Sequence, residues 1–501
     1  MTSVDVAIVG AGPTGAVAAA LAGVHGLSAV AIDRAPDVHD LPRAVAMWDD
    51  VQRILHDAGL LDAILPDTVV HEGGEFVDAA GRRLVGIDVP PGFLTPNGHP
   101  PVRGFHQPTF ERAVRARLAR HRHVALRVGC ELVDFEETAS GVRLLVREGR
   151  ATDEVRARWL LACDGAASGV RKRCGIAWRS LGYDHEWLVV DVSLRRDIGL
   201  SRRTQQVCDP DRPATLVPAP LGMHRWELQL RAGEAREEME RPERVWSLLA
   251  PWVGPADAEI VRAVVYRFHA TIAETFRRGR VFLAGDAAHQ TPPFMGQGLC
   301  SGVRDVQNLV WKLAHVRHGV ADDVLLDTYT VERHPMAVAM VEHSVNTGRA
   351  IDAYATMAGG GPPPPPELAA YAYGGAAELP HLATGLLAAA PRSRWVGRLL
   401  PKCTATTRGR TGLFDDVVGP RWAIVGARDP GASMHDTTRK AWERLDAAFA
   451  VVPEPAGAIL GLLAEHELAV VRPDRIIYGV TDARISLDDL RPPPLRKDAA
   501  P

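Results

Sequence analysis

Three mainly apolar runs in this chain lead directly into a glycine-containing turn and then into a helical pattern. They are residues 4–9, 159–163 and 280–284, and their composition favours strands buried on both faces of a sheet. A fourth run, residues 28–32, ends at an acid, Asp33. Strands that alternate with helices in this way predict an α/β fold built on a parallel sheet.

Other stretches have a different pattern. Residues 48–65 place apolar side chains at helical spacing, whereas residues 69–104 are rich in glycine and proline and predict short strands and loops. Residues 181–270 carry aromatic side chains on alternating stretches, which indicates antiparallel strands. The run of glycines and prolines at residues 359–366 predicts a stiff, extended linker.

The first apolar run is followed by a dinucleotide-binding pattern, Gly-x-Gly-x-x-Gly, that leads into an alanine-rich helix. Gly10 would allow the tight turn, Gly12 would let a pyrophosphate approach the backbone, and Gly15 would let the helix pack on the strand. Asp33 at the end of the next strand could accept a ribose hydroxyl. The strand, glycines, helix and acid together favour a dinucleotide over an ordinary turn, although the motif alone does not separate FAD from NAD.

A second acid follows the third apolar run. Asp286 stands at the predicted carboxyl end of a strand, where ligands of open α/β sheets bind, and Gly296, Gly298 and Gly302 follow it. The three glycines leave bare backbone that could pass close to a flat ligand. An ordinary strand-turn-helix would explain Gly285-Asp286 alone, but not the whole string.

That string, GDAAHQTPPFMGQGLCSGVRDVQNLVWKL from residue 285, resembles the second flavin-binding motif of the class A FAD-dependent aromatic hydroxylases, the para-hydroxybenzoate hydroxylase superfamily. The resemblance implies that Asp286 binds the ribityl chain of FAD and that residues 293–298 cover the flavin ring. Leu299 and Cys300 replace the usual Met-Asn, a change that backbone contacts would tolerate. Further matches are Arg34, Arg43, Gln107 and Asp164.

The resemblance also implies a domain organisation. We expect a discontinuous Rossmann-like FAD-binding domain, an inserted antiparallel β-sheet domain for the substrate, a linker region, a thioredoxin-like C-terminal domain and a disordered tail. The predicted FAD-binding domain comprises residues 1–75, 100–180 and 270–355, and the predicted substrate domain comprises residues 76–99 and 181–269. The linker region covers residues 356–394, the thioredoxin-like domain residues 395–490, and the tail residues 491–501.

The implied activity is hydroxylation of a phenolic ring with O2 and NADH or NADPH, through a flavin hydroperoxide. Part of the sheet segment resembles the branch that acts on 3-(3-hydroxyphenyl)propionate. The same fold could instead serve an epoxidase, a decarboxylating hydroxylase or a Baeyer–Villiger oxygenase on a polyketide-like compound, and a non-catalytic or halogenating FAD protein is a further alternative. The sequence does not identify a catalytic base. His224, His269 and Tyr183 are candidates, although residues of these types more often have a structural role. Pro293 and Gly296 would shield the flavin.

Composition and cysteine spacing bear on nucleic-acid binding, on location and on disulfide or metal sites. A formal charge of −3 and a sequence pI near 6.7 show no excess of positive charge of the kind that indicates nucleic-acid binding. The N-terminus has neither a signal-peptide pattern nor a membrane span, which predicts a cytoplasmic protein. The six cysteines form no CxxC pair and no metal-like spacing, so we expect neither a disulfide nor a metal site. The expected partners are a small aromatic substrate and O2, in a monomer or homodimer.

Overall fold

The central element is a sheet that contains the three apolar runs as neighbouring strands. In the computed structural model, which describes residues 2–373, 379–388, 393–482 and 485–490, this sheet has the order β17-β18-β11-β1-β2-β8. The pairs β18–β11, β11–β1, β1–β2 and β2–β8 are parallel, and β10 and β9 continue from β11 as an antiparallel extension. Its strands are β1 (Thr2–Val9), β2 (Ala29–Asp33), β8 (Val124–Val128), β9 (Cys130–Glu137), β10 (Val142–Glu148), β11 (Ala151–Ala162), β17 (Arg277–Arg278) and β18 (Val281–Leu283).

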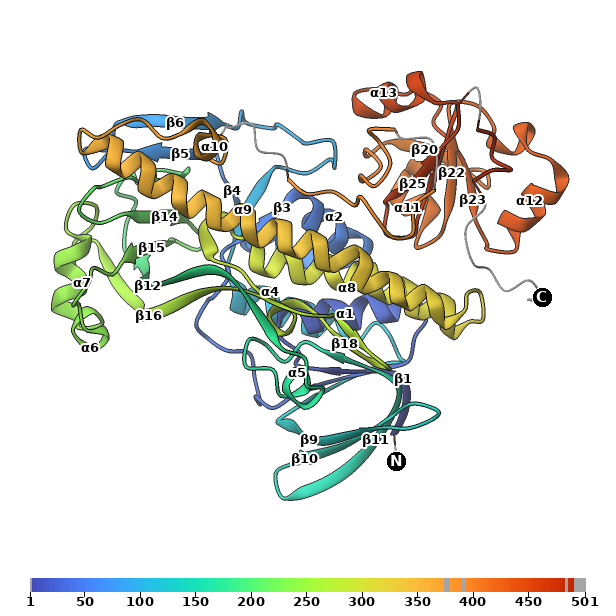
Figure 1. Ribbon diagram of the computed structural model, residues 1–501, viewed down its shortest axis with the longest axis horizontal. Helices are drawn as coiled ribbons and strands as arrows, with labels where there is room; N and C mark the ends of the chain where they lie inside the picture. The colour runs from blue at the N-terminus through green and yellow to red at the C-terminus, as the bar shows by residue number, and fades with distance from the viewer. Residues whose placement is uncertain (1, 374–378, 389–392, 483–484, 491–501) are drawn as a thin grey trace.

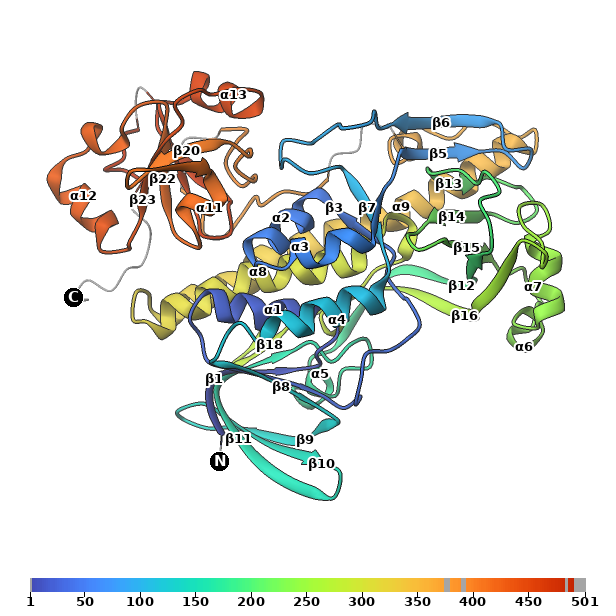
Figure 2. The same cartoon turned by 180° about the vertical axis from the view of Figure 1, so that it is seen from behind.

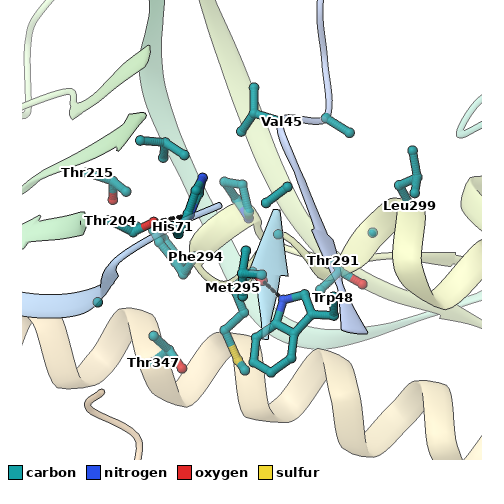
Figure 3. A pocket seen from close by; sticks show the side chains of 18 of the residues that line it. Val45, Trp48, His71, Thr204, Thr215, Thr291, Phe294, Met295, Leu299 and Thr347 are labelled. Carbon is teal, nitrogen blue, oxygen red and sulfur yellow. Dashed lines mark hydrogen bonds between the residues drawn. The ribbon is translucent and has the colours of Figure 1, made fainter. Parts of the chain in front are cut away.

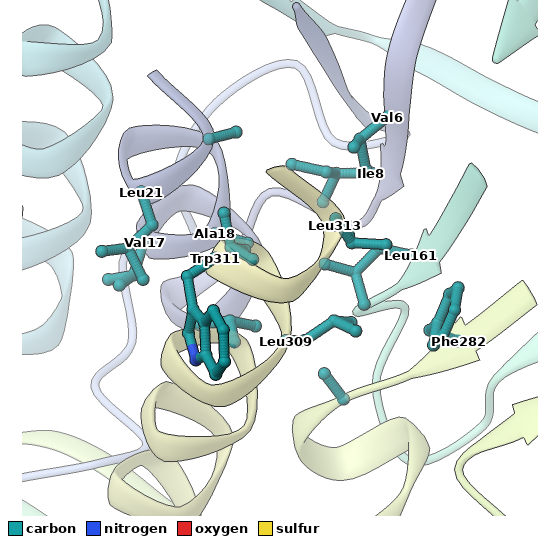
Figure 4. Packing of buried hydrophobic residues seen from close by; sticks show 14 of the residues in the cluster. Val6, Ile8, Val17, Ala18, Leu21, Leu161, Phe282, Leu309, Trp311 and Leu313 are labelled. Carbon is teal, nitrogen blue, oxygen red and sulfur yellow. The ribbon is translucent and has the colours of Figure 1, made fainter. Parts of the chain in front are cut away.

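Helices α1 (Pro13–Val24), α4 (Gln107–Leu118) and α8 (Gln297–Arg317) lie along one face of this sheet (Figure 1). Figure 4 shows how side chains of α1 and α8 meet those of β1, β11 and β18. Ile8, Leu161 and Phe282 are fully buried in this contact, as is Leu309 of α8. The strands are apolar on both faces because both faces are covered, which is the cause of the uninterrupted apolar runs.

A second sheet lies beside the first in Figures 1 and 2, with the order β19-β16-β12-β15-β14-β13-β5-β6. All neighbours pair antiparallel except β13 and β5, which pair in parallel because β5 comes from a separate segment of the chain. The strands extend past the predicted segments at both ends, and two short helices, α6 (Arg236–Met239) and α7 (Pro242–Leu249), were not predicted. The strands are β5 (Gly73–Val77), β6 (Arg83–Asp88), β12 (Trp178–Leu194), β13 (Thr204–Val207), β14 (Ala214–Pro218), β15 (Met223–Gln229), β16 (Ala258–Ala273) and β19 (His289–Gln290).

Shorter elements connect the two sheets. A three-stranded sheet, β3-β7-β4, stands near the helices. The long helix α9 passes beside the second sheet and α8 in Figure 1. Although α8 and α9 are long, no helix within the described segments is both long and apolar enough to cross a bilayer. These elements are β3 (Ala46–Trp48), α2 (Asp49–Asp57), α3 (Leu61–Ile64), η1 (Leu65–Asp67), β4 (Thr68–Val70), β7 (Val102–Phe105), α5 (Gly169–Arg173), η2 (Gly285–Ala287), η3 (Pro293–Met295), η4 (Asp323–Asp327), α9 (Thr328–Ala358) and α10 (Pro366–Ala369).

The C-terminal domain forms a third sheet, with the order β21-β20-β23-β22-β24-β25. Its parallel pair β22–β23 is joined through α12, and the antiparallel hairpin β24–β25 lies on the other side of β22. This is the strand order of a thioredoxin-like core. The predicted tail at 491–501 lies outside the described residues. The elements are β20 (Thr404–Thr407), β21 (Arg410–Leu413), α11 (Phe414–Val418), β22 (Ala423–Gly426), η5 (Pro430–Ser433), α12 (Asp436–Glu443), β23 (Ala448–Val451), α13 (Ala458–Glu465), β24 (Leu468–Val471) and β25 (Ile477–Val480).

Buried ion pairs join this domain to the rest of the chain. Arg472 makes two hydrogen bonds to Glu332 of α9, at 3.0 and 2.9 Å, and Lys312 of α8 reaches the same carboxylate at 2.6 Å. Arg53 of α2 pairs with Asp415 of α11 in the same way, at 2.9 and 2.7 Å. Charges taken out of water need such partners, so the domain is fixed in one position against α2, α8 and α9.

Three further side chains at this interface have the spacing of a metal site, but arginines pair with two of them. One ligand atom each from His56, Asp57 and Asp415 lies within 4.8 Å of the other two. Asp57 accepts a hydrogen bond from Arg475 at 2.9 Å, and Asp415 is paired with Arg53. These carboxylates already have cationic partners, so the group is better described as part of the ion-pair interface.

Arg472→Met tests the interface. The substitution would leave the fully buried Glu332 with Lys312 as its remaining cation and Asp474 without its arginine, so we expect a loss of about 3–5 kcal/mol in the free energy of unfolding. Urea denaturation measures it. The matched control is Arg408→Met, which removes an exposed pair with Asp446 and should change stability little. Equal effects of the two substitutions would contradict the structural role of the buried network.

Candidate active site

One large cavity lies where the carboxyl ends of the first sheet meet the second sheet. Its volume is about 780 Å³, and it extends from Gly12 at the start of α1 to Glu227 on β15. Figure 3 shows part of its wall, to which β3, the loop before α8, β13, β14 and α9 contribute. The predicted nucleotide loop and the second sheet therefore share one chamber.

The glycine loop has the geometry that its pattern predicts. Gly10 has φ +91°, and a Cβ there would lie 2.3 Å from the carbonyl oxygen of Cys163. A Cβ on Gly15 would lie 1.8 Å from the carbonyl oxygen of Gly10, so the helix packs directly on the turn. A Cβ on Gly12, by contrast, would meet nothing within 4 Å, and Gly12 lines the cavity.

Helix α1 begins at this open position. Its N-cap is Gly12, which has no side chain to satisfy the first amides of the helix. Free amides at a helix N-terminus attract an anion. The open space above Gly12 and the uncapped amides fit the pyrophosphate of a dinucleotide.

Asp33 lies beside the glycine loop at the end of β2. Its carboxylate accepts hydrogen bonds from the backbone amides of Ala11, at 2.8 Å, and Ala35, at 2.9 Å. Arg34, the next residue, is exposed and is not among the described residues that line the cavity. Asp33 therefore helps to shape the loop, and its contact with a ribose remains a prediction.

Asp286 faces the cavity from the turn after β18. Within the described chain no donor hydrogen-bonds its carboxylate, which is exposed to the cavity. Desolvation in the cavity wall raises the pKa of the carboxyl, and the nearby charges of His289 and Arg43 oppose the rise. A carboxylate without a partner at the wall of a chamber can accept a hydroxyl of a ligand.

The turn that carries Asp286 is held from behind by Asp305 of α8. The fully buried carboxylate of Asp305 accepts hydrogen bonds from the amide of Gly285 at 3.0 Å, Nε2 of His289 at 2.7 Å and Nε of Arg333 at 2.8 Å. Burial raises the pKa of Asp305, but the charges of His289 and Arg333 outweigh it and the pKa lies below its ordinary value. No local pattern in the sequence distinguishes this structural acid from Asp286, which faces the cavity.

The loop before α8 approaches β3. Gly296 has φ +63°, and a Cβ there would lie 3.2 Å from Cβ of Ala46. The indole of Trp48 donates a hydrogen bond to the carbonyl of Met295 at 3.0 Å, which fixes this approach (Figure 3). The loop contributes three further predicted residues to the cavity wall: Pro293, Gly298 and Leu299.

Cys300 differs from its neighbours in the loop. Its thiol is fully buried, lies 3.9 Å from the carbonyl oxygen of Ala46 and is not part of the described cavity wall. Burial raises the pKa of this thiol to about 11. The side chain is therefore a packing group at physiological pH, and any contact of Cys300 with a ligand would involve its backbone.

Gln107 and Asp164 organise the backbone around the chamber. The side-chain oxygen of Gln107 accepts hydrogen bonds from the amides of Arg43 at 2.9 Å and Ala44 at 2.7 Å, so it positions the segment that carries Arg43 into the cavity wall. Asp164 accepts from the amide of Val170 at 3.1 Å. Asp164 itself lies just behind the wall.

The three candidate bases all lie outside the described cavity wall. Tyr183 is buried against Phe294, with ring centroids 5.6 Å apart, and burial raises its pKa. His224 is half-buried on β15, and burial lowers its pKa. His269 is exposed and lies 3.5 Å from Asp184. The structure therefore gives none of them direct access to the chamber.

Two further titratable groups of the chamber wall, His71 and Glu227, were not singled out from the sequence as candidate bases. His71 donates from Nε2 to the carbonyl of Pro218 at 3.0 Å and accepts at Nδ1 from Thr204 at 3.1 Å, and burial lowers its pKa to about 4. Glu227 is a buried acid on β15 whose pKa burial raises to about 7. The only local signal was an acidic residue between Trp226 and Leu228, in a strand that also carries His224 and Arg225.

Comparisons with known proteins agree with this architecture. The model of the FAD binding domain family matches residues 3–344, and that of the HcaD C-terminal domain matches residues 397–489. The chain belongs to the FAD-dependent aromatic hydroxylases. The α/β fold and the FAD cofactor expected from the sequence are thereby confirmed, and the enzyme is a flavoprotein monooxygenase.

Two relatives match this hydroxylase over nearly its whole length. "Probable NADH-specific resorcinol 4-hydroxylase" of Rhodococcus jostii is 35% identical, over 95% of this chain and 92% of the relative. "3-(3-hydroxy-phenyl)propionate/3-hydroxycinnamic acid hydroxylase" of Burkholderia cenocepacia is 35% identical, over 96% and 94%.

Solved structures share the fold at lower identity. The flavin-dependent monooxygenase PieE, in complex with FAD and substrate, has a TM-score of 0.80 at 20% identity and 96% coverage of both chains. Aklavinone-11 hydroxylase, with FAD and aklavinone, has a TM-score of 0.77 at 24% identity, over 98% of this chain and 99% of that one. All parts of the hydroxylase, including the C-terminal domain, thus have counterparts in known folds.

Asp305→Asn tests the anchor behind the site. The amide keeps the shape but leaves Arg333 buried without its anionic partner, so we expect a loss of about 3–5 kcal/mol in the free energy of unfolding at pH 7. Because the folded pKa of Asp305 is lowered, its stabilisation is complete above the unfolded value of about 3.9 and is lost as the pH falls through the folded pKa.

Urea denaturation of parent and variant at several pH values measures this difference. The difference in the free energy of unfolding between parent and variant should be largest at pH 7 and should decrease below pH 4. Asp184→Asn, which removes an exposed partner of Arg267, is the control and should change stability little. A variant as stable as the parent at pH 7 would refute the anchoring role.

Proposed function

We propose that this monooxygenase hydroxylates the ring of a small phenol, with O2 as oxidant and NADH or NADPH as reductant. The observation that carries the proposal is the single chamber, in which the glycine loop around Gly12 and the polar wall around Glu227 are continuous. The names of the two relatives support a phenolic ring, and that of the Rhodococcus protein supports NADH.

Within this proposal, the residues predicted from sequence hold FAD. The amides at the N-terminus of α1, beside Gly12, would hold the pyrophosphate; Asp33 would bind the adenosine ribose and Asp286 the ribityl chain. The loop of residues 293–298 supplies bare backbone for the flavin ring. When bound, FAD supplies the redox chemistry, from hydride acceptance to oxygen transfer.

The protein's own contribution is to orient the phenol and to exclude water. Trp48, Phe294 and Met295 form an apolar part of the wall beside the loop (Figure 3). Next to Phe294, Thr215 donates a hydrogen bond to Gln206 at 2.6 Å, and Gln206 donates to the hydroxyl of Tyr373 at 3.3 Å. A dry chamber with a few fixed polar groups favours one orientation of an aromatic ring.

The remaining predictions belong to the same proposal. The sequence has no second dinucleotide motif that leads into a helix, so the nicotinamide cofactor would bind transiently in a groove rather than in a dedicated domain. We further infer a cytoplasmic location and a monomer or homodimer.

The decisive experiment is a screen of NADH and NADPH oxidation against a panel of phenols, with mass analysis of the products. A gain of one oxygen atom on the ring supports the proposal. Oxygen gain with loss of carbon dioxide, or ring expansion to a lactone, would replace it with decarboxylation or Baeyer–Villiger chemistry. Consumption of NADH without an oxygenated product from any phenol would refute it.

Asp286→Ala tests the cofactor assignment separately from turnover. The substitution removes one charged acceptor from the cavity wall, so FAD should bind about 10- to 100-fold more weakly, as expected for a hydrogen bond worth about 1.5–3 kcal/mol. Fluorescence titration of FAD-free protein measures the affinity. The thermal stability of the FAD-free variant should match the parent, since Asp286 has no described hydrogen-bond partner to lose. Unchanged affinity would contradict the assignment.

A further inference from the structure

Glu227 is the buried acid of the substrate half of the chamber. It lies on β15 directly opposite Thr215 of β14, its side chain lines the cavity, and the residue is only 4% exposed. Among the described residues, no donor hydrogen-bonds its carboxylate. The carboxylate oxygens are accessible from the cavity rather than enclosed by protein, so a ligand in the chamber can supply the donor.

The nearest cation does not fill that role. The guanidinium of Arg225 is bound to both oxygens of Asp191, at 2.7 and 3.0 Å, and to the carbonyls of Pro42 and Arg43. Its closest approach to Glu227 is 4.0 Å, which is too long for a hydrogen bond. Arg262 is likewise held by Asp191 and the carbonyl of Pro42.

Among the other described residues of the wall, Arg43 is the one cation, and the proposed function assigns it to FAD. Burial lowers the pKa values of His71 and His343, so both are neutral at pH 7. Arg43 lies on the side of the chamber assigned to FAD. Asp88, near the second sheet's edge, adds a negative charge that is already paired with Arg83 and Arg203.

We propose that Glu227 is the specificity-determining residue of this hydroxylase: it accepts a hydrogen bond from a substrate hydroxyl and rejects phenols that carry a carboxylate. The inference rests on the proposed function and narrows it to uncharged phenols. An unpaired buried acceptor discriminates strongly in favour of a ligand that donates to it, and a second carboxylate in the same dry space would be repelled. By this criterion the chamber suits resorcinol better than 3-(3-hydroxyphenyl)propionate.

The test measures binding rather than turnover. FAD-loaded protein is titrated without NADH at pH 8, where Glu227 is mostly ionised, and the change in the flavin absorption spectrum reports Kd. The probes are 3-(3-hydroxyphenyl)propionate and its carboxamide, which match in shape and differ in charge, and resorcinol. We expect the carboxamide to bind at least about 10-fold more tightly than the acid, a difference of 1.4 kcal/mol.

Substitutions at position 227 test whether Glu227 causes the difference in affinity between the carboxamide and the acid. Glu227→Gln should weaken resorcinol binding and reduce the carboxamide-to-acid ratio towards one, whereas Glu227→Asp, which keeps the charge, should retain the ratio. Glu186→Gln removes a glutamate on β12 of the same sheet, whose side chain is paired with Arg236 and is not part of the described cavity wall, and should leave all three affinities unchanged.

Each result decides the proposal. A parent that binds the acid as tightly as the carboxamide, a ratio that Glu227→Gln leaves intact, or a failure of all three probes to bind would overturn it. Because the ratio is taken within one variant, a partly destabilised protein does not obscure it. Probes that bind as predicted without being oxygenated would refute the proposed function and leave the role of Glu227 standing.

Discussion

The site depends on one buried carboxylate, that of Asp305. It satisfies donors from three segments at once: the turn after β18, the short strand β19 and the helix α9. Because it sits on α8, the same helix that packs against α1, it sets the distance between the glycine loop and the Asp286 turn. A charge in the protein interior is tolerated only with such a complete set of partners, and here that requirement aligns the elements that surround the chamber.

The chamber joins two sheets with different tasks. The first sheet is covered by helices and supplies the backbone turn at Gly12, where a ligand can approach without meeting side chains. The second sheet supplies side chains that face the cavity, such as Thr215 and Glu227. This division explains why one half of the site is recognisable as a local sequence motif and the other is not.

The same division determines what the sequence could predict. The positions of Gly10, Gly15 and Gly296 were predictable because steric limits act over a few neighbouring residues. His71 and Glu227 were not, since strands from distant parts of the chain bring them to one wall and no local pattern records that pairing. The candidate bases His224 and His269 were chosen by residue type alone, and the register of β15 and β16 places them away from the cavity.

The segment after the proline run also has a role that its composition did not indicate. It was predicted as a linker, yet Tyr371 and Tyr373 form part of the chamber wall, and farther along Leu386 is buried, with its amide bonded to Glu332. The path to the C-terminal domain thus runs through the substrate chamber. In recombination between relatives, a crossover at the prolines would exchange part of the chamber wall together with the C-terminal domain. Such a crossover would therefore change the wall and the domain at the same time.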